Sequence, residues 1–307
     1  MLLHERITLR SRVGFIGLGY LGSRIARRLV TAGFPTVVYD IDHTKAVELA
    51  ALGADVAQHS GKLAGEVDVV LSCLPDEHAV EAAYLGTGNV LSSARPGTRI
   101  IELSTISPAA SRQLHQAARQ FAVSTLDVAV SGSTSSAEAG ALTLFGGGGR
   151  EVFEAAEAIF SAIAKQWFYM GPDGSGVAMK LVVNALLGVG MQAIAEAVAL
   201  GLRLDLPRDL LLDTLAKTAV VAPAHVGKLA TAEKQDYSPQ FPVRLMRKDF
   251  GLILSAAEQL GISMPVTEAA AAINYAEAES GIEEDFSAVI RRMEQEAGVE
   301  NALPPAA

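Results

Sequence analysis

A glycine-rich turn between a strand-like and a helix-like segment constrains the fold of this chain more than any other feature. The apolar run Val13-Gly14-Phe15-Ile16 is followed by Gly17-Leu18-Gly19-Tyr20-Leu21-Gly22, which has the spacing Gly-x-Gly-x-x-Gly. The first glycine permits a tight turn, the second lets a pyrophosphate approach the backbone, and the third lets helix pack on strand. An acidic residue, Asp40, ends the next strand-like run, where a ribose would bind. The pattern predicts a dinucleotide site with phosphates at a helix N-terminus.

The order of the remaining segments predicts two domains. Strand-like and helix-like segments alternate in the first half, which is typical of a parallel α/β sheet. We expect strands at 13–16, 36–39, 67–74, 99–103, 126–130, 141–145 and 167–169, and helices at 22–31, 44–52 and 108–121. After the turn at Gly171-Pro172-Asp173-Gly174 only helical periodicity follows, at 196–202, 208–218, 246–260 and 265–280. The predicted domains are residues 1–173 and 174–307, joined by a long helix that begins near Gly176, with a disordered tail at 303–307.

Composition excludes several classes of protein. The net charge of −9 gives no general basic surface for nucleic acid or an anionic membrane. One cysteine, Cys73, excludes an internal disulfide and fits a reducing, cytoplasmic compartment. The six histidines have no metal-ligand spacing, so we predict no metal site. The apolar segment 177–202 has the length of a membrane span, but polar residues interrupt it, and we expect a buried helix between domains instead.

Lys180 opens a helix-like segment that is otherwise almost entirely Val, Leu, Ala and Gly. Lysine is rarely buried without a partner, so this residue is either a functional amine or one whose ammonium reaches solvent from a helix end. Asn184 lies four residues later on the same helical face, and is either a substrate-binding amide or a packing residue satisfied internally. With the dinucleotide site, the lysine suggests hydride and proton transfer, its pKa lowered by desolvation and the nicotinamide charge.

Four ordered motifs make nearly the whole chain, from about residue 13 to 290, resemble the β-hydroxyacid dehydrogenase family. This family includes 3-hydroxyisobutyrate dehydrogenases, tartronate semialdehyde reductases, and glyoxylate or succinic semialdehyde reductases. The motifs are Gly14-Phe15-Ile16-Gly17-Leu18-Gly19, Asp127-Val128-Ala129-Val130-Ser131-Gly132-Ser133, residues 174–184, and Lys248-Asp249. The resemblance implies a Rossmann-type doubly wound sheet followed by an all-helical domain, with the active site between them.

The resemblance also implies a role for each matching residue. Lys180 resembles the catalytic lysine, and Ser131, Gly132 and Ser133 resemble the loop that holds the substrate carboxylate, although many relatives have a second glycine at position 133. Asn184 matches the second asparagine of a Lys-x-x-Asn-Asn pattern. The implied cofactor contacts are Gly17, Leu18, Gly19, Tyr20, Leu21, Gly22 and Asp40, together with Leu74, Pro75, Thr105 and Lys248, which resemble contacts near the nicotinamide end.

One branch of the family shares further features with this chain. Val183 replaces the first asparagine of the pattern, as in the glyoxylate and succinic semialdehyde reductase branch, and segment 236–242 also looks like that branch. NADPH-using members of the branch have Asn-Arg-Thr after the second strand, where this chain has Asp40-Ile41-Asp42. The arginine for a 2′-phosphate is lost and a carboxylate is gained, so NAD is the expected cofactor, with NADP less favoured. His43 and Lys45 soften that preference.

We therefore predict an NAD(P)-dependent oxidoreductase that transfers hydride between NAD and a small 3-hydroxy acid or its semialdehyde, with Lys180 as general acid and base. One alternative is an NADPH-dependent glyoxylate or succinic semialdehyde reductase. A non-catalytic cofactor-binding module is an alternative of another class, which the lysine, Asn184 and the serine loop disfavour. Imine reductases share the architecture but usually replace the lysine. We expect a small carboxylate substrate, a homodimer or homotetramer, and no nucleic-acid or membrane partner.

Overall fold

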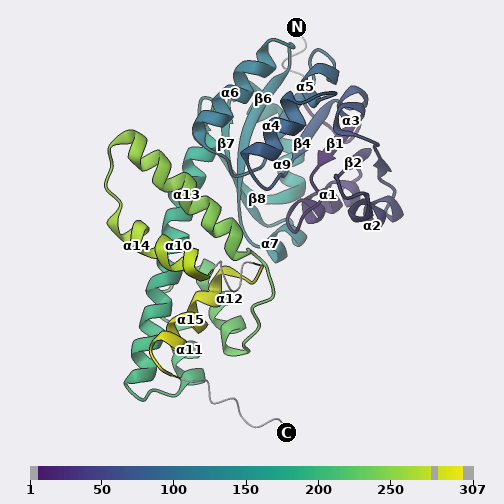
Figure 1. Ribbon diagram of the computed structural model, residues 1–307. Helices are drawn as coiled ribbons and strands as arrows, with labels where there is room; N and C mark the ends of the chain where they lie inside the picture. The colour runs from purple at the N-terminus through teal and green to yellow at the C-terminus, as the bar shows by residue number, and fades with distance from the viewer. Residues whose placement is uncertain (1–5, 278–282, 300–307) are drawn as a thin grey trace. The chain divides into compact units, whose positions relative to one another are not determined.

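The computed structural model describes residues 6–277 and 283–299 of the chain (Figure 1). The chain divides into two compact units, Met1–Lys180 and Leu181–Ala307. The first is an α/β unit and the second is entirely helical among its described residues. The boundary between the units falls within one long helix, α10 (Ser175–Arg203). Lys180 therefore belongs to the first unit and Asn184 to the second.

An eight-stranded sheet organises the first unit, with the order β3-β2-β1-β4-β5-β6-β7-β8. Its first six strands in chain order are parallel, and their order is that of a doubly wound dinucleotide-binding sheet. The strands are β1 (Val13–Ile16), β2 (Thr36–Tyr39), β3 (Asp55–Val56), β4 (Val69–Ser72), β5 (Arg99–Glu102), β6 (Ser124–Ser131), β7 (Leu142–Gly148) and β8 (Ala164–Gly171). The neighbours of β1 are β2 on one side and β4 on the other, so the strand order reverses there.

Helices cover both faces of this sheet because its central strands are apolar on both sides. One core joins Phe15, Leu71 and Leu126 to α1, α2, α7, α8 and α9, and the other joins Val70 and Ile100 to α3, α4, α5 and α6. The helices are α1 (Gly22–Thr31), η1 (His43–Ala46), α2 (Val47–Ala51), α3 (Ser60–Glu66), α4 (Glu77–Leu85), α5 (Val90–Ser93), α6 (Pro108–Arg119), α7 (Thr134–Glu138), α8 (Arg150–Ala155) and α9 (Glu157–Ile163).

The observed elements confirm the predicted fold class and add detail that periodicity missed. The expected strands at 13–16 and 36–39 and the expected helix at 22–31 have the observed bounds. The short strand β3 was not predicted, and its two residues are exposed. Strand β7 runs antiparallel to β6, which departs from a purely parallel sheet. The link between them is short and contains only the five-residue helix α7, so the chain reverses instead of crossing over.

The second unit packs its helices around a separate apolar core. Leu181, Met191 and Val198 of α10 contribute to this core together with Phe250 and Ile253 of α13. The elements beyond α10 are α11 (Arg208–Ala216), α12 (Pro223–Glu233), α13 (Val243–Leu260), α14 (Pro265–Glu277), η2 (Phe286–Ala288) and α15 (Val289–Glu296). The predicted tail at 303–307 and the end of the predicted helix 265–280 lie outside the described residues.

Helix α10 is the one helix in the described part of the chain with the length and composition to cross a membrane. Its most apolar 18-residue window is 39% buried within the protein. Leu181 and Met191 belong to the core of the helical unit, whereas Leu186 and Leu200 are exposed. A single helix of this kind is weak evidence for a membrane span, and α10 contributes residues to the core of the helical unit.

Candidate functional site: a dinucleotide cradle and a lysine-bearing helix

The turn after β1 has the geometry that its three glycines predict. Gly17 has φ +92°, and a Cβ there would lie 2.4 Å from the carbonyl oxygen of Cys73. A Cβ on Gly22 would lie 2.0 Å from the carbonyl oxygen of Gly17, so the start of α1 packs directly on the turn. A Cβ on Gly19, in contrast, would meet nothing within 4 Å. Gly17 and Gly22 are therefore needed for close packing of the turn itself, whereas the absence of a side chain at Gly19 leaves space beside the turn for a ligand.

The start of α1 fits a pyrophosphate. Leu21 occupies the N-cap position, and no side chain among the described residues caps the helix. The first amide groups of a helix need acceptors from outside the helix, and the helix dipole favours an anion there. An uncapped ten-residue helix behind an open glycine turn therefore provides a phosphate cradle. The residues of this unit fit a dinucleotide, and Gly17 to Gly22 would hold its phosphates.

Asp40 lies directly after β2 and is buried against the glycine turn. The backbone N–H of Leu18 donates to Asp40 Oδ2 at 2.7 Å, and that of Asp42 donates to Oδ1 at 2.9 Å. Lys45 Nζ lies 3.4 Å from Oδ1. The carboxylate therefore links the phosphate turn to the segment after β2, the place where a ribose hydroxyl is bound in dinucleotide sites. Exposed Asp42 adds a second carboxylate, whose pKa is lowered by hydrogen bonds from Thr44.

Leu74, Pro75 and Thr105 lie beyond the carboxyl ends of β4 and β5. These strands are parallel to β1 and β2, so the turns that follow all four strands share one edge of the sheet (Figure 1). A hydrogen bond of 2.7 Å from the Leu74 N–H to Ser104 Oγ joins the segments after β4 and β5. The structure thus brings the predicted contacts of the first unit to a single edge, at the point where the strand order reverses.

The predicted carboxylate-binding loop lies at the end of β6. Ser131 is the last residue of this strand, and Gly132 has φ +140°, a conformation that favours glycine. Ser133 is the N-cap of α7, and its Oγ accepts the Ser136 N–H at 3.2 Å. The same oxygen lies 2.7 Å from Ser135 Oγ. The Ser133 hydroxyl therefore already has local partners.

Asp127 anchors the start of α10, a role that was missed from the sequence. Its carboxylate accepts the Gly174 N–H at 2.8 Å and the Val177 N–H at 3.0 Å, so it caps the helix that carries Lys180. His115 of α6 lies between two carboxylates, with Nε2 3.3 Å from Asp127 and Nδ1 3.0 Å from Asp173. Asp127 was visible in the sequence only as the first residue of a motif. Its partners are 47 and 50 residues away.

Helix α10 carries Lys180 and Asn184 one turn apart on one face. Lys180 is half-buried and lies near the start of the helix. Asn184 is fully buried, and its Nδ2 donates to Asp249 Oδ2 of α13 at 2.5 Å. Lys248 Nζ lies 3.2 Å from Asp249 Oδ1. The helical unit therefore brings together Asn184, Asp249 and Lys248.

Asp249 is a further residue of this cluster that was not named as a site residue from the sequence. The motif Lys248-Asp249 was the available signal, but only the lysine was assigned a role. Asn184 Oδ1 is buried and has no hydrogen-bond partner within the described part of the chain. The buried amide of Asn184 and the carboxylate of Asp249 therefore form a rigid hydrogen-bonded pair in an otherwise apolar helical core.

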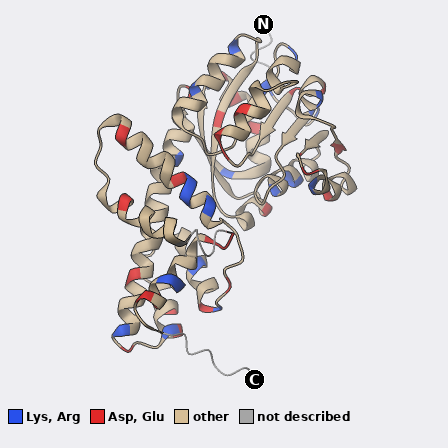
Figure 2. Ribbon diagram, viewed as in Figure 1, with Lys and Arg blue, Asp and Glu red and all other residues tan. Residues whose placement is uncertain are grey.

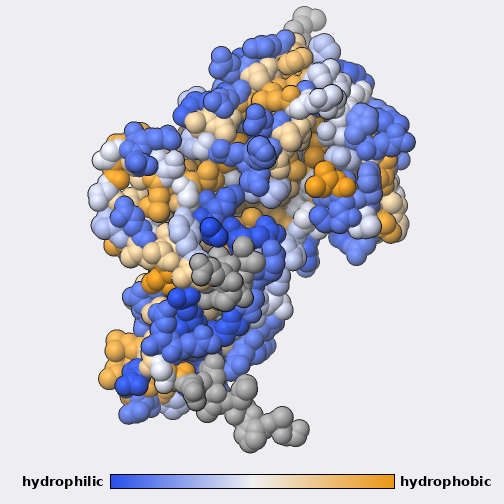
Figure 3. Space-filling model, viewed as in Figure 1, coloured by the Kyte–Doolittle hydropathy of each residue, from blue (hydrophilic) through white to orange (hydrophobic). Residues whose placement is uncertain are grey.

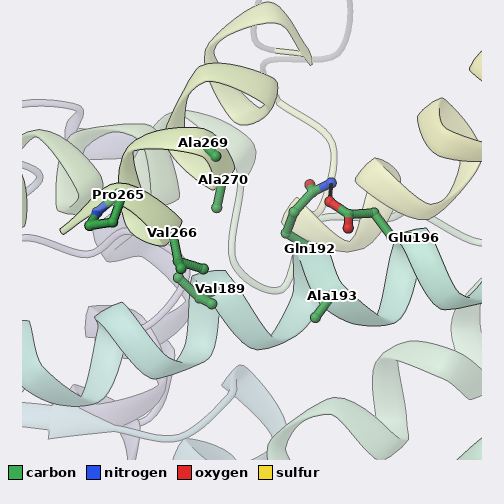
Figure 4. A pocket seen from close by; sticks show the side chains of 8 residues that line it. All are labelled: Val189, Gln192, Ala193, Glu196, Pro265, Val266, Ala269 and Ala270. Atoms are coloured by element: carbon green, nitrogen blue, oxygen red, sulfur yellow. Dashed lines mark hydrogen bonds between the residues drawn. The ribbon is translucent and has the colours of Figure 1, made fainter.

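One hollow in the helical unit is lined by none of the predicted site residues. It has a volume of about 340 Å³ and is lined by Val189, Gln192, Ala193, Glu196, Pro265, Val266, Ala269 and Ala270 (Figure 4). Gln192 Nε2 donates to Glu196 Oε1 at 2.9 Å, whereas Gln192 Oε1 is buried and has no hydrogen-bond partner among the described residues. Among the residues described, no group of three His, Cys, Asp or Glu could hold a metal ion.

Family models match both halves of the chain. Residues 12–171 match the NAD-binding domain of 6-phosphogluconate dehydrogenase, and residues 174–293 match the NAD-binding region of NADP-dependent 3-hydroxyisobutyrate dehydrogenase. The fold and the glycine turn thus define a dehydrogenase that uses a nicotinamide dinucleotide, NAD or NADP. The chain belongs to the β-hydroxyacid dehydrogenase family.

Characterised relatives agree over most of their lengths. The chain is 36% identical to the NAD-dependent L-serine dehydrogenase of Pseudomonas aeruginosa, covering 91% of this chain and 96% of that one. It is 33% identical to the 2-(hydroxymethyl)glutarate dehydrogenase of Eubacterium barkeri, covering 94% and 96%. The Mycobacterium tuberculosis 3-hydroxyisobutyrate dehydrogenase, solved with L-serine, is similar with a TM-score of 0.84, 31% identity and coverage of 92% and 99%. These names span several substrates, so the semialdehyde reductase branch stays a prediction.

Proposed function

We propose that this protein oxidises a small 3-hydroxy acid, or reduces the matching semialdehyde, with NAD as the preferred cofactor. The observation that carries the proposal is helix α10, which presents Lys180 and Asn184 one turn apart and is anchored by Asp127. The named relatives that act on L-serine and 2-(hydroxymethyl)glutarate support a substrate with a hydroxymethyl group and a carboxylate. The bound nicotinamide would accept or donate the hydride.

Lys180 would move the proton of this reaction. During oxidation its amine would take the proton from the substrate hydroxyl, and during reduction its ammonium would return a proton to that oxygen. The half-buried position near a helix start limits its contact with water. The Asp127 anchor supports the role because it fixes both the position and the rotation of the helix that carries the lysine.

Asn184 and the Ser131–Ser133 loop would orient the substrate. The Asn184 side chain is held by Asp249, so its orientation is fixed before a substrate binds. The backbone at Gly132 and the hydroxyl of Ser131 would supply donors for the substrate carboxylate. Because the Ser133 hydroxyl caps α7, we assign that residue to loop shape more than to direct substrate binding.

The preference for NAD over NADP is supported by the charges after β2. The Asp40 carboxylate and the exposed Asp42 carboxylate would repel a 2′-phosphate, and Thr44 holds the pKa of Asp42 below its usual value. Lys45 partly offsets this repulsion because its ammonium lies near Asp40. An NADPH-dependent glyoxylate or succinic semialdehyde reductase is the alternative within the family.

We also propose a homodimer or larger homo-oligomer in the cytoplasm. The helical unit exposes several large apolar side chains, and Figure 3 shows such side chains at its surface. The most exposed of them are Leu186, Leu204, Val220, Leu260 and Val266. Acidic and basic residues are interspersed over both units, so charge does not suggest a nucleic-acid partner (Figure 2). Sedimentation of the purified protein as a monomer at micromolar concentration would contradict the assembly.

One panel of assays tests the function. Absorbance of the reduced nicotinamide would be followed with L-serine, 3-hydroxyisobutyrate, 2-(hydroxymethyl)glutarate, glyoxylate and succinic semialdehyde, using NAD(H) and NADP(H) in turn. We expect the highest kcat/KM with a 3-hydroxy acid and NAD. Turnover of glyoxylate or succinic semialdehyde with NADPH alone would favour the alternative, and no turnover with cofactor binding intact would favour a non-catalytic module.

A further inference from the structure

A buried polar cluster lies beneath the edge of the sheet where the cofactor contacts gather. It consists of Ser72, the last residue of β4, Glu102, the last residue of β5, and Tyr84 of α4. Ser72 and Glu102 are neighbours in the register of the two strands, and all three side chains are at most 1% exposed. Tyr84 Oη lies 2.5 Å from Ser72 Oγ, and Ser72 Oγ donates to Glu102 Oε2.

Either hydroxyl could donate between Tyr84 and Ser72, but the Ser72 hydrogen is used toward Glu102, so Tyr84 donates to Ser72 and Glu102 is the final acceptor. A tyrosine hydroxyl that donates to serine, and a serine hydroxyl that donates to a carboxylate, leave every donor with a partner. The other oxygen, Glu102 Oε1, accepts the Ser104 N–H at 2.7 Å. Both oxygens of a fully buried carboxyl group are therefore used, one toward the cluster and one toward the segment that follows β5.

The same bonds fix two segments that carry predicted cofactor contacts. Ser104, held by Glu102, accepts the Leu74 N–H at its Oγ, so the turn after β4 depends on the turn after β5. Farther along, the Ser107 N–H donates to Glu77 Oε1 at 2.5 Å. Thr105 lies between these two anchored residues. Its backbone position is therefore set from both sides, and Glu102 supplies the anchor on the strand side.

Burying Glu102 is costly, because a carboxylate loses its hydration in the protein interior. Desolvation raises the pKa of Glu102, although hydrogen bonds from Ser104, Ser72 and Tyr84 partly offset that effect. An apolar side chain could fill the same space without this cost. An apolar side chain could not, however, accept a hydrogen bond from the Ser104 N–H. This bond fixes the turn after β5 and, through Ser104, the turn after β4.

We propose that Glu102 is a positioning residue for the nicotinamide half of the cofactor. Through Ser104 it holds Thr105 and Leu74 in place, whereas the glycine turn and Asp40 hold the adenosine diphosphate half. The inference deepens the proposed function, because it rests on assigning the turns after β4 and β5 to the nicotinamide end. The whole dinucleotide binds along this edge of the sheet, but Glu102 affects the binding of its nicotinamide half alone.

Calorimetric titration with two ligands tests the inference without measuring turnover. NAD+ and ADP-ribose share the adenosine diphosphate ribose part, but only NAD+ has the nicotinamide ring. For Glu102→Ala we expect NAD+ to bind about tenfold more weakly, the loss expected for one hydrogen-bonded anchor, and ADP-ribose to bind within twofold of the wild type. Glu102→Gln keeps an oxygen for the Ser104 N–H and should restore NAD+ affinity to within about threefold of the wild type.

Asp40→Asn is the matched control, because it should weaken both ligands by similar factors. Ser104→Ala removes the bond to Leu74 with little change of volume, and should repeat the selective loss if Glu102→Ala folds poorly. An equal loss of both ligands in Glu102→Ala and Ser104→Ala, or unchanged NAD+ affinity in both, would overturn the inference. A wild-type protein that binds NAD+ but turns over no hydroxy acid would overturn the proposed function and leave this result standing.

Discussion

The two units hold their candidate site residues in different ways. In the nucleotide-binding unit the cradle is made largely by backbone, with Gly17 and Gly22 packed tightly and Gly19 left open. In the helical unit the site depends on side chains, because Asn184 and Asp249 form a buried polar pair between α10 and α13. The first arrangement is sensitive to atoms that are added, and the second to atoms that are removed. Lys180 is the last residue of the first unit and belongs to helix α10.

The largest expected effect is the loss of catalytic rate when the Lys180 side chain is removed and the backbone that binds the cofactor is left intact. Lys180→Ala should lower kcat by about 10³-fold, within the range for loss of a general acid and base, while NAD+ affinity changes less than about threefold. Steady-state kinetics and calorimetric titration would measure the two quantities. Lys217→Ala, which removes an exposed lysine paired with Asp213, is the control and should leave both unchanged. A Lys180→Ala variant with a near-normal kcat would refute the assigned role.

The next effect concerns an atom added to the cradle. Gly19→Ala should weaken NAD+ binding about tenfold or more, because a methyl group would stand where the pyrophosphate approaches the backbone. The fold has room for this methyl group, so the thermal midpoint should change by less than about 2 °C. In the control, Gly227→Ala adds a Cβ that also meets nothing, but in helix α12, and should leave NAD+ affinity unchanged. Equal affinities of Gly19→Ala and the wild type would place the phosphates elsewhere.

A smaller effect tests the side-chain pair of the helical unit. Asn184→Ala and Asp249→Ala should each lower the free energy of unfolding by about 1–3 kcal/mol, because each leaves a buried polar partner without its hydrogen bond. The double variant should lose clearly less than the sum of the two. Urea unfolding of the four proteins in the cycle measures this coupling. Additive losses would show that the two side chains do not depend on each other.

The smallest expected effect is a pH dependence of stability that arises from Glu102 in the nucleotide-binding unit. Burial raises the pKa of Glu102, so the folded protein keeps a proton there that the unfolded chain releases above about pH 4.5. The contribution of Glu102 to stability should therefore fall as pH rises from that value and level off above the raised pKa. Relative to wild type, Glu102→Gln should gain stability over the same range, as measured by urea unfolding at several pH values. A difference that is constant with pH would contradict the raised pKa.

Much of the nucleotide-binding unit could be predicted because its signals are local. The turn after β1 needs glycine for reasons of backbone conformation and close contact within a few residues, and apolar runs mark the buried parallel strands. The short exposed strand β3 and several short helices gave no such signal. The antiparallel direction of β7 was also hidden, because a run of apolar residues does not indicate strand direction.

The sequence by itself determined the dinucleotide turn, the class of fold and a lysine at the start of a long helix. Tertiary structure alone decided which polar residues meet: Asp127 with the first turn of α10, Asn184 with Asp249, and Glu102 with Ser72, Tyr84 and Ser104. The physical reason is range. Backbone sterics and hydrophobic periodicity act over a few residues, whereas a buried polar group must find a partner from any segment that packing brings beside it.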